Sequence, residues 1–330
     1  MQIQENISLR QYNTFGIDVR ARYFSSFAGI DPLAAWIEKN TRIKKIFLGG
    51  GSNILFTKNV DGIVLKNEIA GIDEIKEDDT YVYVRAGAGE NWHRFVQYCI
   101  QRNWAGLENL SLIPGSVGAA PMQNIGAYGV ELQEVFSSLN AYNLHDKKVH
   151  NFTAGDCAFG YRESIFKKQY KDQFIILNVT FRLHKHPVFH TSYGAIQQQL
   201  EGMGVKELSI QSIAVIGNAG SFFKNPEIPK KQFDALQRTH PGIPHYPAKQ
   251  YAPSSAPGKE LVKLAAGWLV EQCGWKGVRR GDAGVHVNQA LVLVNYSNAT
   301  GKEIYDLSEE ILHSVHKKFG VQLEREVNIV

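Results

Sequence analysis

The sequence predicts an α+β protein built from several packed domains, and three observations support this. Its 330 residues exceed the roughly 100–200 residues of a typical domain. Hydrophobic residues make up 44% of the chain and charged residues 21%, a composition typical of folded globular proteins. Segments with the alternating period of strands are interleaved with segments of helical period, and no internal repeat or low-complexity linker separates them.

Strands are predicted where apolar residues alternate or form a short run. The clearest alternation is that of Ile175, Leu177, Val179, Phe181 and Leu183, which indicates one face of a half-buried strand. The other runs are shorter and are bounded by glycine or polar residues. The predicted strands span residues 45–48, 62–66, 80–85, 173–183, 290–294 and 321–330.

Helices are predicted where apolar residues recur three and four positions apart. Asp31 and Pro32 have the form of a helix start in which the aspartate caps free amides. Thr300 and Glu303 form a capping box for a helix that ends near residue 320. The apolar position of Cys99 predicts a core residue. The predicted helices span residues 31–40, 91–100, 231–238, 261–269 and 300–320.

The composition excludes several classes of function. Cys99, Cys157 and Cys273 are widely separated and form no pair of metal-ligand spacing, so neither a disulfide framework nor a metal site is expected. No apolar run reaches the length of about 18 residues that a membrane span needs, and no export signal is recognisable, which predicts a cytoplasmic protein without a membrane partner. The net charge of +4 is small and dispersed, so no nucleic-acid partner is expected.

The first of two glycine-rich segments follows the strand at residues 45–48. Its glycines, at positions 49 to 51, let backbone N–H groups approach a phosphate, and Ser52 and Asn53 add side-chain donors. The segment matches neither the dinucleotide fingerprint nor a Walker loop. Taken alone, it is as compatible with a plain tight turn as with a pyrophosphate site.

The second segment, residues 105–130, is broken by glycine and proline yet is apolar, so it should fold against another part of the protein. Its small residues permit close contact, its carboxamides hydrogen-bond, and Tyr128 can pack on a ring, as a flavin would require. The alternative is a structural loop without a ligand, but two such segments favour a dinucleotide. The candidate cofactor-binding residues are Gly49, Gly50, Gly51, Ser52, Asn53, Pro114, Gly115, Ser116, Gly118, Ala119, Ala120, Gln123, Asn124, Ile125, Gly126 and Tyr128.

Several motifs follow one another in a fixed order along nearly the whole chain. They are Asn13-Thr14-Phe15-Gly16, residues 49–53, residues 113–129, Gly160-Tyr161-Arg162-Glu163-Ser164, residues 217–226, residues 286–295 and Leu323-Glu324-Arg325-Glu326-Val327. This set resembles the UDP-N-acetylenolpyruvoylglucosamine reductase (MurB) family. The resemblance implies a two-part FAD-binding fold of the vanillyl-alcohol-oxidase (PCMH) type and a C-terminal α/β substrate-binding domain. The corresponding parts are residues 1–68, 69–204 and 205–320, followed by a strand at 321–330 that returns to the active site.

The resemblance also implies a reaction. FAD would be bound non-covalently, NADPH would be the hydride donor, and the enolpyruvyl ether of a UDP-amino sugar would be reduced in peptidoglycan precursor synthesis. The protein is expected to act as a monomer. Two alternatives are a non-catalytic flavin or nucleotide-sugar binding protein on the same scaffold, and a flavin oxidase, although no attachment motif for covalent flavin is recognisable.

Arg162, Ser221 and Glu326 match the catalytic positions of the family. Addition of hydride to the methylene carbon leaves negative charge beside the carboxylate, so a cation and a proton donor are needed. Arg162 would polarise the carboxylate, Ser221 would donate the proton, and Glu326 would assist Arg162. Without the resemblance, these residues would be interpreted as a salt-bridge arginine, a turn serine and an edge-strand glutamate.

Four further residues match substrate-binding positions. Tyr193 resembles a loop tyrosine that closes over the nucleotide, Lys224 would make a Ser221 alkoxide tolerable, and Asn225 and Gln289 would orient the diphosphate or the sugar. The chain also departs from the family. It lacks a basic segment before residue 217, has Asn328 where arginine is common, and has two alanines at positions 119 and 120 where some relatives have serines.

Overall fold

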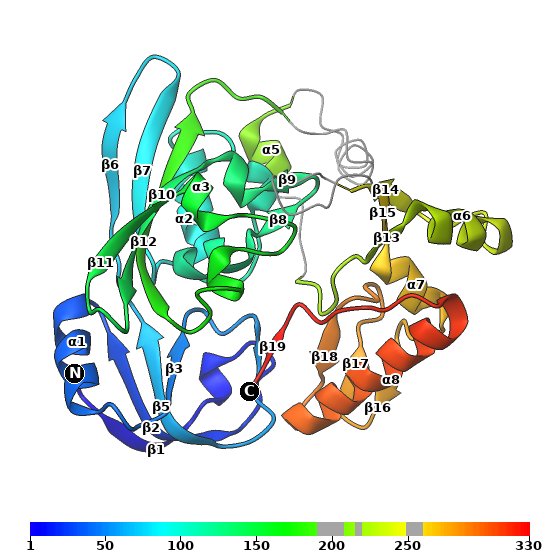
Figure 1. The fold of residues 1–330 in the computed structure, drawn as a ribbon, viewed down its shortest axis with the longest axis horizontal. Coiled ribbons are helices and arrows are strands. Elements are labelled where there is room, and N and C mark those ends of the chain that lie inside the picture. The colour runs from blue at the N-terminus through cyan, green and yellow to red at the C-terminus, as the bar shows by residue number, and fades with distance from the viewer. Residues whose placement is uncertain (190–207, 215–219, 249–259) are drawn as a thin grey trace. The chain divides into compact units, whose positions relative to one another are not determined.

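The computed structural model describes residues 1–189, 208–214, 220–248 and 260–330. The chain divides into two compact units, each assembled from separate stretches of sequence (Figure 1). Unit 1 comprises Met1–Ile7, Ala21–Gly51 and Val60–Ala219, and unit 2 comprises Ser8–Arg20, Ser52–Asn59 and Gly220–Val330. The family-based division at residues 68, 204 and 320 stays a prediction.

The strands in the described part of unit 1 form two sheets and a hairpin. One sheet has the order β1 (Gln4–Ser8), β2 (Arg20–Phe27), β5 (Val60–Asn67), β3 (Lys45–Leu48), and β5 runs parallel to β2 and β3. The other has the order β11 (Val149–Thr153), β10 (Phe136–Asn143), β12 (Phe174–His184), β7 (Tyr81–Gly87), β6 (Ile72–Glu77), with antiparallel neighbours. The hairpin joins β8 (Gly126–Ala127) to β9 (Val130–Glu131).

Strand β12 contributes to two hydrophobic cores of unit 1. Ile175 and Leu177 pack in the core that includes α1, whereas Val179 and Phe181 pack in the core that includes α2. The ring centroids of Phe181 and Phe95 are 4.8 Å apart, and burial of side chains of this size contributes roughly 1.5–3 kcal/mol each. The α-helices among the described residues of unit 1 are α1 (Ile30–Lys39), α2 (Trp92–Ile100), α3 (Ala154–Cys157) and α5 (Ile210–Ala214).

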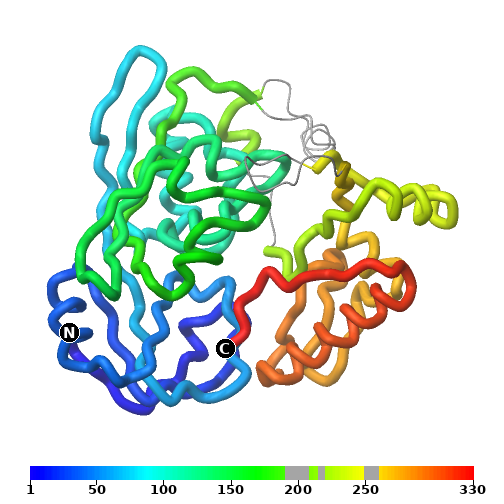
Figure 2. The backbone as a smooth tube through the Cα atoms, viewed as in Figure 1, coloured from blue at the N-terminus to red at the C-terminus, as the bar shows by residue number. Residues whose placement is uncertain are grey.

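Unit 2 combines short strands with three helices in its described residues. Its sheets have the orders β13-β15-β14, β16-β17-β18 and β19-β4. The strands are β4 (Ile54–Leu55), β13 (Glu227–Pro229), β14 (His245–Pro247), β15 (Leu261–Leu264), β16 (Arg279–Arg280), β17 (Ala283–Val285), β18 (Leu293–Asn295) and β19 (Asn328–Ile329), and the helices are α6 (Lys230–Thr239), α7 (Ala266–Gln272) and α8 (Gly301–Phe319). The C-terminal segment that follows α8 can be traced in Figure 2 to β19.

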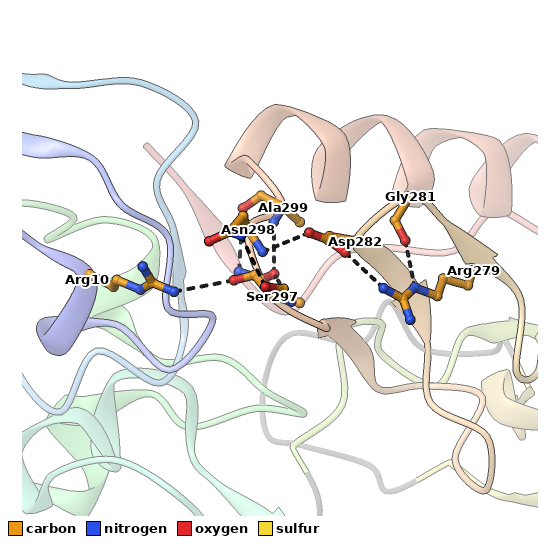
Figure 3. A network of polar contacts seen from close by, with 8 residues as sticks. Arg10, Arg279, Gly281, Asp282, Ser297, Asn298 and Ala299 are labelled. Atoms are coloured by element: carbon orange, nitrogen blue, oxygen red, sulfur yellow. Dashed lines mark hydrogen bonds and ion pairs between the residues drawn. The ribbon is translucent and has the colours of Figure 1, made fainter.

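A polar network around Asp282 holds the remote parts of unit 2 together (Figure 3). The Asp282 carboxylate accepts hydrogen bonds from the Asn298 backbone N–H at 3.0 Å and from Arg279 Nη2 at 2.8 Å. These bonds lower the pKa of Asp282, with the Asn298 N–H as the largest cause. In the same network, Arg10 donates to the carbonyl oxygen of Ser297 at 3.4 Å. The segment that contains Arg10 is thereby attached to the C-terminal part of the chain.

The structure confirms most of the predicted helices and strands whose hydrophobic pattern was long or whose ends carried a capping signal. The structure has strands at residues 45–48, 60–67, 81–87 and 174–184, and helices at 92–100 and 230–239. Thr300 and Glu303 form the predicted capping box, and Gly320 ends α8 with a positive φ of 65°. Cys99 is fully buried in the core, as predicted.

Three predictions of local structure were wrong. The first helix begins at Ile30 after an extended Gly29, so Asp31 lies inside the first turn and is not the capping residue. Residues 261–264 form strand β15, and only residues 266–272 are helical. The predicted strands at 290–294 and 321–330 shrink to Leu293–Asn295 and Asn328–Ile329. In the last two cases a short apolar stretch was compatible with more than one period.

No helix among the described residues is long and apolar enough to cross a membrane. The same part of the chain contains no group of three or more histidine, cysteine, aspartate or glutamate side chains that could hold a metal ion.

Candidate active site

The two glycine-rich segments lie directly against each other in unit 1. A Cβ atom added to Gly50 would lie 2.7 Å from the Cα atom of Gly115 and 2.8 Å from its carbonyl carbon. One added to Gly49 would lie 2.5 Å from Ser116 Oγ. Because the atoms that Gly50 meets are backbone, they cannot rotate away, and glycine is required there. These glycines therefore serve the close approach of the two segments.

The start of helix α2 holds the second segment in place. Asn91 caps the helix by accepting a hydrogen bond from the Arg94 N–H at 3.0 Å, and it also forms a β-bridge with Ser116. The Trp92 N–H donates to the carbonyl oxygen of Gly115 at 3.1 Å, and its indole N–H donates to Leu110 at 2.7 Å. The predicted change to helical period after residue 91 thus also fixes the loop that follows.

Ser116 provides a test of whether the predicted FAD fits. Its hydroxyl oxygen is buried and has no hydrogen-bond partner among the residues that the structure describes. Leaving such a group unpaired costs roughly 1–3 kcal/mol, which a ligand oxygen or nitrogen would recover. The exposed residues Gly50 and Ala119 adjoin it, so the two segments form a cradle with accessible edges. We call Gly49–Gly51 and residues 114–120 the cradle; it fits a dinucleotide such as FAD.

The three small residues at positions 118 to 120 of the cradle use their amide N–H groups within the protein. The Gly118 N–H donates to Ala88 at 2.9 Å, the Ala119 N–H to Ser116 at 3.0 Å, and that of Ala120 to residue 117 at 3.2 Å. Their amides are used within the protein, so what these residues can contribute is close approach. Pro114 is exposed at the edge of this segment, and Gln123 is half-buried.

The hairpin β8–β9 turns at two residues with left-handed backbone conformation. Tyr128 has a φ of 52° and Gly129 one of 85°, as a two-residue type I′ turn requires. A tyrosine in this position carries backbone strain, which is found most often at functional sites. Burial raises the pKa of Tyr128, so the phenol stays protonated at neutral pH.

Asn124 lies fully buried at the end of the second segment, with a φ of 45°. Its side-chain nitrogen donates to the carbonyl oxygen of Gly160 at 3.0 Å and to Glu131 Oε2 at 3.2 Å. Its side-chain oxygen accepts from the Gln133 N–H at 3.0 Å. The hydrogen-bonding groups of this carboxamide are therefore used within the protein. The side chain of the next residue, Ile125, is buried in the hydrophobic core.

Arg162 lies in a tight turn between Gly160 and Glu163. Gly160 and Glu163 exchange backbone hydrogen bonds at 3.0 and 3.2 Å, and Arg162 between them has a φ of 55°. Its Nη2 donates to the carbonyl oxygen of Gly126, and its guanidinium lies 5.4 Å from the ring centroid of Tyr161. Glu163 forms an ion pair with Lys168. The Glu163 carboxylate, the alternative partner weighed from the sequence, is thus paired with a lysine.

Ser221 and Glu326 lie next to each other at one end of a short antiparallel pairing in unit 2. Phe223 pairs with Arg325, the Glu326 N–H donates to the carbonyl oxygen of Phe222 at 2.8 Å, and the Lys224 N–H donates to Glu324 at 2.9 Å. Ser221 directly precedes this pairing and is half-buried. We call residues 222–224 and 324–326 the catalytic ladder. Ser221 and Glu326, which are far apart in the sequence, are therefore neighbours in the structure.

Asn53, at the end of the first glycine-rich segment, also holds Glu326 in place. Asn53 Nδ2 donates to the carbonyl oxygen of Glu326 at 3.1 Å. The backbone carbonyl of Asn53 accepts from the N–H of Asn328 at 3.1 Å and from its side chain at 2.9 Å. Asn328, where the resemblance led us to expect arginine, thus pairs with the segment at 52–59. Ser52 and Asn53 belong to unit 2, whereas Gly49–Gly51 belong to unit 1.

The predicted substrate-binding residues occupy different environments. Lys224 Nζ lies 3.1 Å from Glu324 Oε2, and its side chain is only 13% exposed. Asn225 Oδ1 accepts from the Ala266 N–H at 2.8 Å and so caps α7. Gln289 is exposed on the loop between β17 and β18. Tyr193 lies outside the described residues, as does the junction at 215–219 where the basic segment was found missing.

Glu131 is a residue that the sequence prediction missed. It is 5% exposed, and its carboxylate accepts from Asn124 and from Gln133 Nε2 at 2.7 Å. A Cβ atom added to Gly126 would meet both Arg162 Nη1, at 2.7 Å, and Glu131 Cγ, at 3.0 Å. The available signal was the spacing of Glu131 and Glu134, which form a capping box.

Comparison with known proteins identifies relatives of the whole chain. The FAD binding domain family matches residues 33–151, and the C-terminal domain of UDP-N-acetylenolpyruvoylglucosamine reductase matches residues 211–330. The reductases of that name from Amoebophilus asiaticus and Flavobacterium johnsoniae are 48% and 46% identical, over 100% of this chain and of each relative. The first alignment spans 348 positions, more than the 330 residues here, so this relative carries residues that the chain lacks.

A solved structure has a similar fold. The crystal structure of UDP-N-acetylenolpyruvylglucosamine reductase (MurB) from Thermus caldophilus has a TM-score of 0.64 and 22% identity to this chain. The similarity covers 100% of this chain and 99% of that chain. Together with the family matches, this likeness confirms the predicted fold class, an α+β FAD-binding fold with a C-terminal substrate-binding domain.

Proposed function

The chain belongs to the UDP-N-acetylenolpyruvoylglucosamine reductase (MurB) family, and from that premise we propose how its residues carry out the reaction. The protein is an FAD-containing oxidoreductase that reduces UDP-N-acetylenolpyruvoylglucosamine to UDP-N-acetylmuramate with NADPH, in peptidoglycan precursor synthesis. The observation that carries this function is the full-length identity to reductases of that name. The chemistry supplied by bound FAD is the transfer of a hydride from NADPH to the enolpyruvyl methylene carbon.

The cradle would hold the cofactor non-covalently. Ser116 has a buried hydroxyl to share with it, and Gly50 and Gly115 keep the two segments close enough to form one surface. Ser52, Asn53, Gln123 and Tyr128 remain cofactor-binding candidates on the segments that flank the cradle. The carboxamide of Asn53 also holds Glu326, so its role in cofactor binding would be combined with support of a catalytic residue.

Arg162 would bind the carboxylate of the enolpyruvyl group. A guanidinium offers a fork of donors that stays charged at any physiological pH, and the charge that develops on the carboxylate during reduction strengthens that interaction. The bond to the Gly126 carbonyl and the ring of Tyr161 hold the guanidinium in place. Such a preorganised cation acts on the transition state more than on the bound substrate.

Ser221 would donate the proton to the carbon next to the carboxylate. An isolated serine is a poor acid, so its alkoxide needs a nearby cation or a hydrogen-bond donor. Lys224 follows Ser221 by three residues, and its side chain is largely shielded from solvent, which strengthens its field. Glu326, which lies next to Ser221, would assist Arg162 in stabilising the intermediate. Asn225, Gln289 and Tyr193 would contact the nucleotide sugar.

One anaerobic titration tests this function. The purified protein is expected to be yellow, to lose its flavin absorbance on addition of NADPH, and to regain it on addition of UDP-N-acetylenolpyruvoylglucosamine. Recovery with the substrate but not with UDP-N-acetylglucosamine, which lacks the enolpyruvyl group, would establish the reaction. Bleaching without recovery, or binding without bleaching, would instead favour a flavin or nucleotide-sugar binding protein. We also propose that the enzyme is a cytoplasmic monomer, which size-exclusion chromatography and cell fractionation test.

A further inference from the structure

Three hydrogen bonds attach the turn that carries Arg162 to the segment next to the cradle. The carbonyl oxygen of Gly160 accepts from Asn124 Nδ2 at 3.0 Å, and Arg162 Nη2 donates to the carbonyl oxygen of Gly126. The hydroxyl of Ser164, which is 1% exposed, donates to the carbonyl oxygen of residue 122 at 2.6 Å. The turn and the segment are thereby fixed to each other before, within and after the arginine.

Asn124 is the side chain at the centre of this attachment. Both of its N–H donors are used, one by Gly160 and one by Glu131, and its oxygen accepts from Gln133. It is fully buried and adopts a left-handed conformation that asparagine tolerates better than most residues. Its carboxamide therefore has no donor left for a ligand, although the sequence placed it among the cofactor-binding residues.

We propose that Asn124 and Glu131 are positioning residues that hold Arg162 in the orientation needed to bind the substrate carboxylate. This inference rests on the proposed role of Arg162. Asn124 holds the start of the arginine turn through Gly160, and Glu131 holds Asn124 from the opposite strand of the hairpin. Glu131 also pairs directly with Gly126, whose carbonyl oxygen accepts from Arg162.

The geometry explains why Arg162 needs such support. A φ of 55° is unfavourable for arginine, so the turn would relax unless its surroundings held it. The bond from Asn124 to the Gly160 carbonyl is one such constraint, and it is shielded from water. The side chain of Glu131, which is buried and acidic, also lies near the guanidinium, since its Cγ atom and Arg162 Nη1 would both contact a Cβ atom added to Gly126; its negative charge adds electrostatic restraint.

Asn124→Gly tests the proposal, because glycine keeps the left-handed backbone and removes only the carboxamide. The two half-reactions are measured separately under anaerobic conditions by stopped-flow absorbance. We expect NADPH to reduce the flavin within about twofold of the parent rate, and the enolpyruvyl substrate to reoxidise it about tenfold or more slowly, because small misplacements of a binding group are costly. Calorimetry should show correspondingly weaker binding of the substrate to the oxidised protein.

Asn103→Gly is the matched control. Asn103 also has a left-handed backbone, with a φ of 58°, but it is exposed at the end of α2 and bonds only Gln211 among the described contacts of its side chain. It should change neither half-reaction. Glu131→Gln serves as the second variant, and it should show the same selective loss if Asn124→Gly is too unstable to purify.

A double variant separates positioning from a direct role. In an Arg162→Lys background, Asn124→Gly should cause little further slowing of reoxidation, because its effect passes through the arginine. The proposal is overturned if Asn124→Gly weakens flavin binding or NADPH reduction, or if its effect adds fully to that of Arg162→Lys. Failure of the parent protein to be reoxidised by the substrate would instead refute the proposed function.

Discussion

The arginine turn of unit 1 and the catalytic ladder of unit 2 hold their functional residues by different means. Arg162 is fixed by side-chain hydrogen bonds from buried groups such as Asn124 and Ser164. Ser221 and Glu326 are placed by backbone pairing, with Phe222 and Phe223 buried beneath them. The arginine turn therefore depends on the identity of its neighbours, whereas the ladder depends on its register and on its core.

This difference teaches where each region is vulnerable. A backbone ladder survives replacement of an outward side chain, because the N–H and carbonyl groups that form it are unchanged. A turn held by buried carboxamides and hydroxyls loses a constraint whenever one of them is replaced, and leaves its former partner unsatisfied. The predictions below are ordered from the largest expected effect to the smallest.

Ser221→Ala should separate chemistry from structure most clearly. Removal of the proton donor should slow flavin reoxidation by the enolpyruvyl substrate about 10²–10⁴-fold. Since the ladder bonds from Phe222 to Glu326 are backbone bonds, the melting temperature and the reduction by NADPH should stay unchanged. Stopped-flow absorbance and calorimetry measure both, with the exposed Ser297→Ala as the control. A parent-like rate of reoxidation would remove Ser221 from the mechanism.

Phe223→Ala should show that the ladder depends on its core. This side chain is 1% exposed, and truncation of a buried phenylalanine costs about 3–5 kcal/mol. Chemical denaturation should report that loss, and reoxidation should slow even where the variant is folded, because the strand carrying Ser221 shifts. Phe27→Ala, in a core of unit 1, should lose stability without the second effect. Equal slowing in both variants would contradict this view of the ladder.

Gly50→Ala tests the close approach within the cradle. The new Cβ atom would lie 2.7 Å from a backbone carbon of Gly115, so we expect a loss of about 1–3 kcal/mol in unfolding free energy and weaker retention of FAD. Gly155→Ala is the control, since its Cβ atom would lie 3.8 Å from Thr153 Oγ1 on the exposed helix α3. Unaltered flavin content in Gly50→Ala would show that the two segments can separate without consequence.

Glu324→Gln should have the smallest effect. It breaks the ion pair with Lys224 on the ladder, but the carboxylate side chain is 71% exposed and well screened. The free energy of unfolding should fall by less than about 1 kcal/mol. Thermal unfolding at low and high salt would detect the change, and the gap between variant and parent should narrow in high salt. A loss as large as that of Phe223→Ala would mean that side chains, not backbone bonds, hold the ladder.

Local signals in the sequence predicted much of the fold. Helix α8 was predicted because Thr300, Glu303 and Gly320 each act on the backbone next to them. Strand β15 was predicted as helix because Leu261 and Leu264 are three residues apart, a spacing that four residues cannot assign to one period. Short elements of unit 2 are decided by their partners in space, which the local pattern does not contain.

In the candidate site, too, the sequence predicted some features and could not predict others. Its candidate residues could be chosen from motifs, and the structure brings two of them, Ser221 and Glu326, close together. Their pairing could not be derived from spacing, because the two strands are distant in sequence. The role of Asn124 was obscured for a physical reason: a carboxamide in a glycine-rich loop suits a ligand or a buried backbone group equally well, and burial decides between them.

The pairing of β19 with β4 has a consequence for biosynthesis. Asn328 and Ile329, which are synthesised long after Ile54 and Leu55, form a parallel pair with those two residues. Helix α8 also begins against that early stretch, since a Cβ atom added to Gly301 would overlap the carbonyl group of Phe56. Unit 2 can therefore finish folding only after residue 329 has been synthesised, whereas the described strands of the unit 1 sheets are complete once residue 184 has been made.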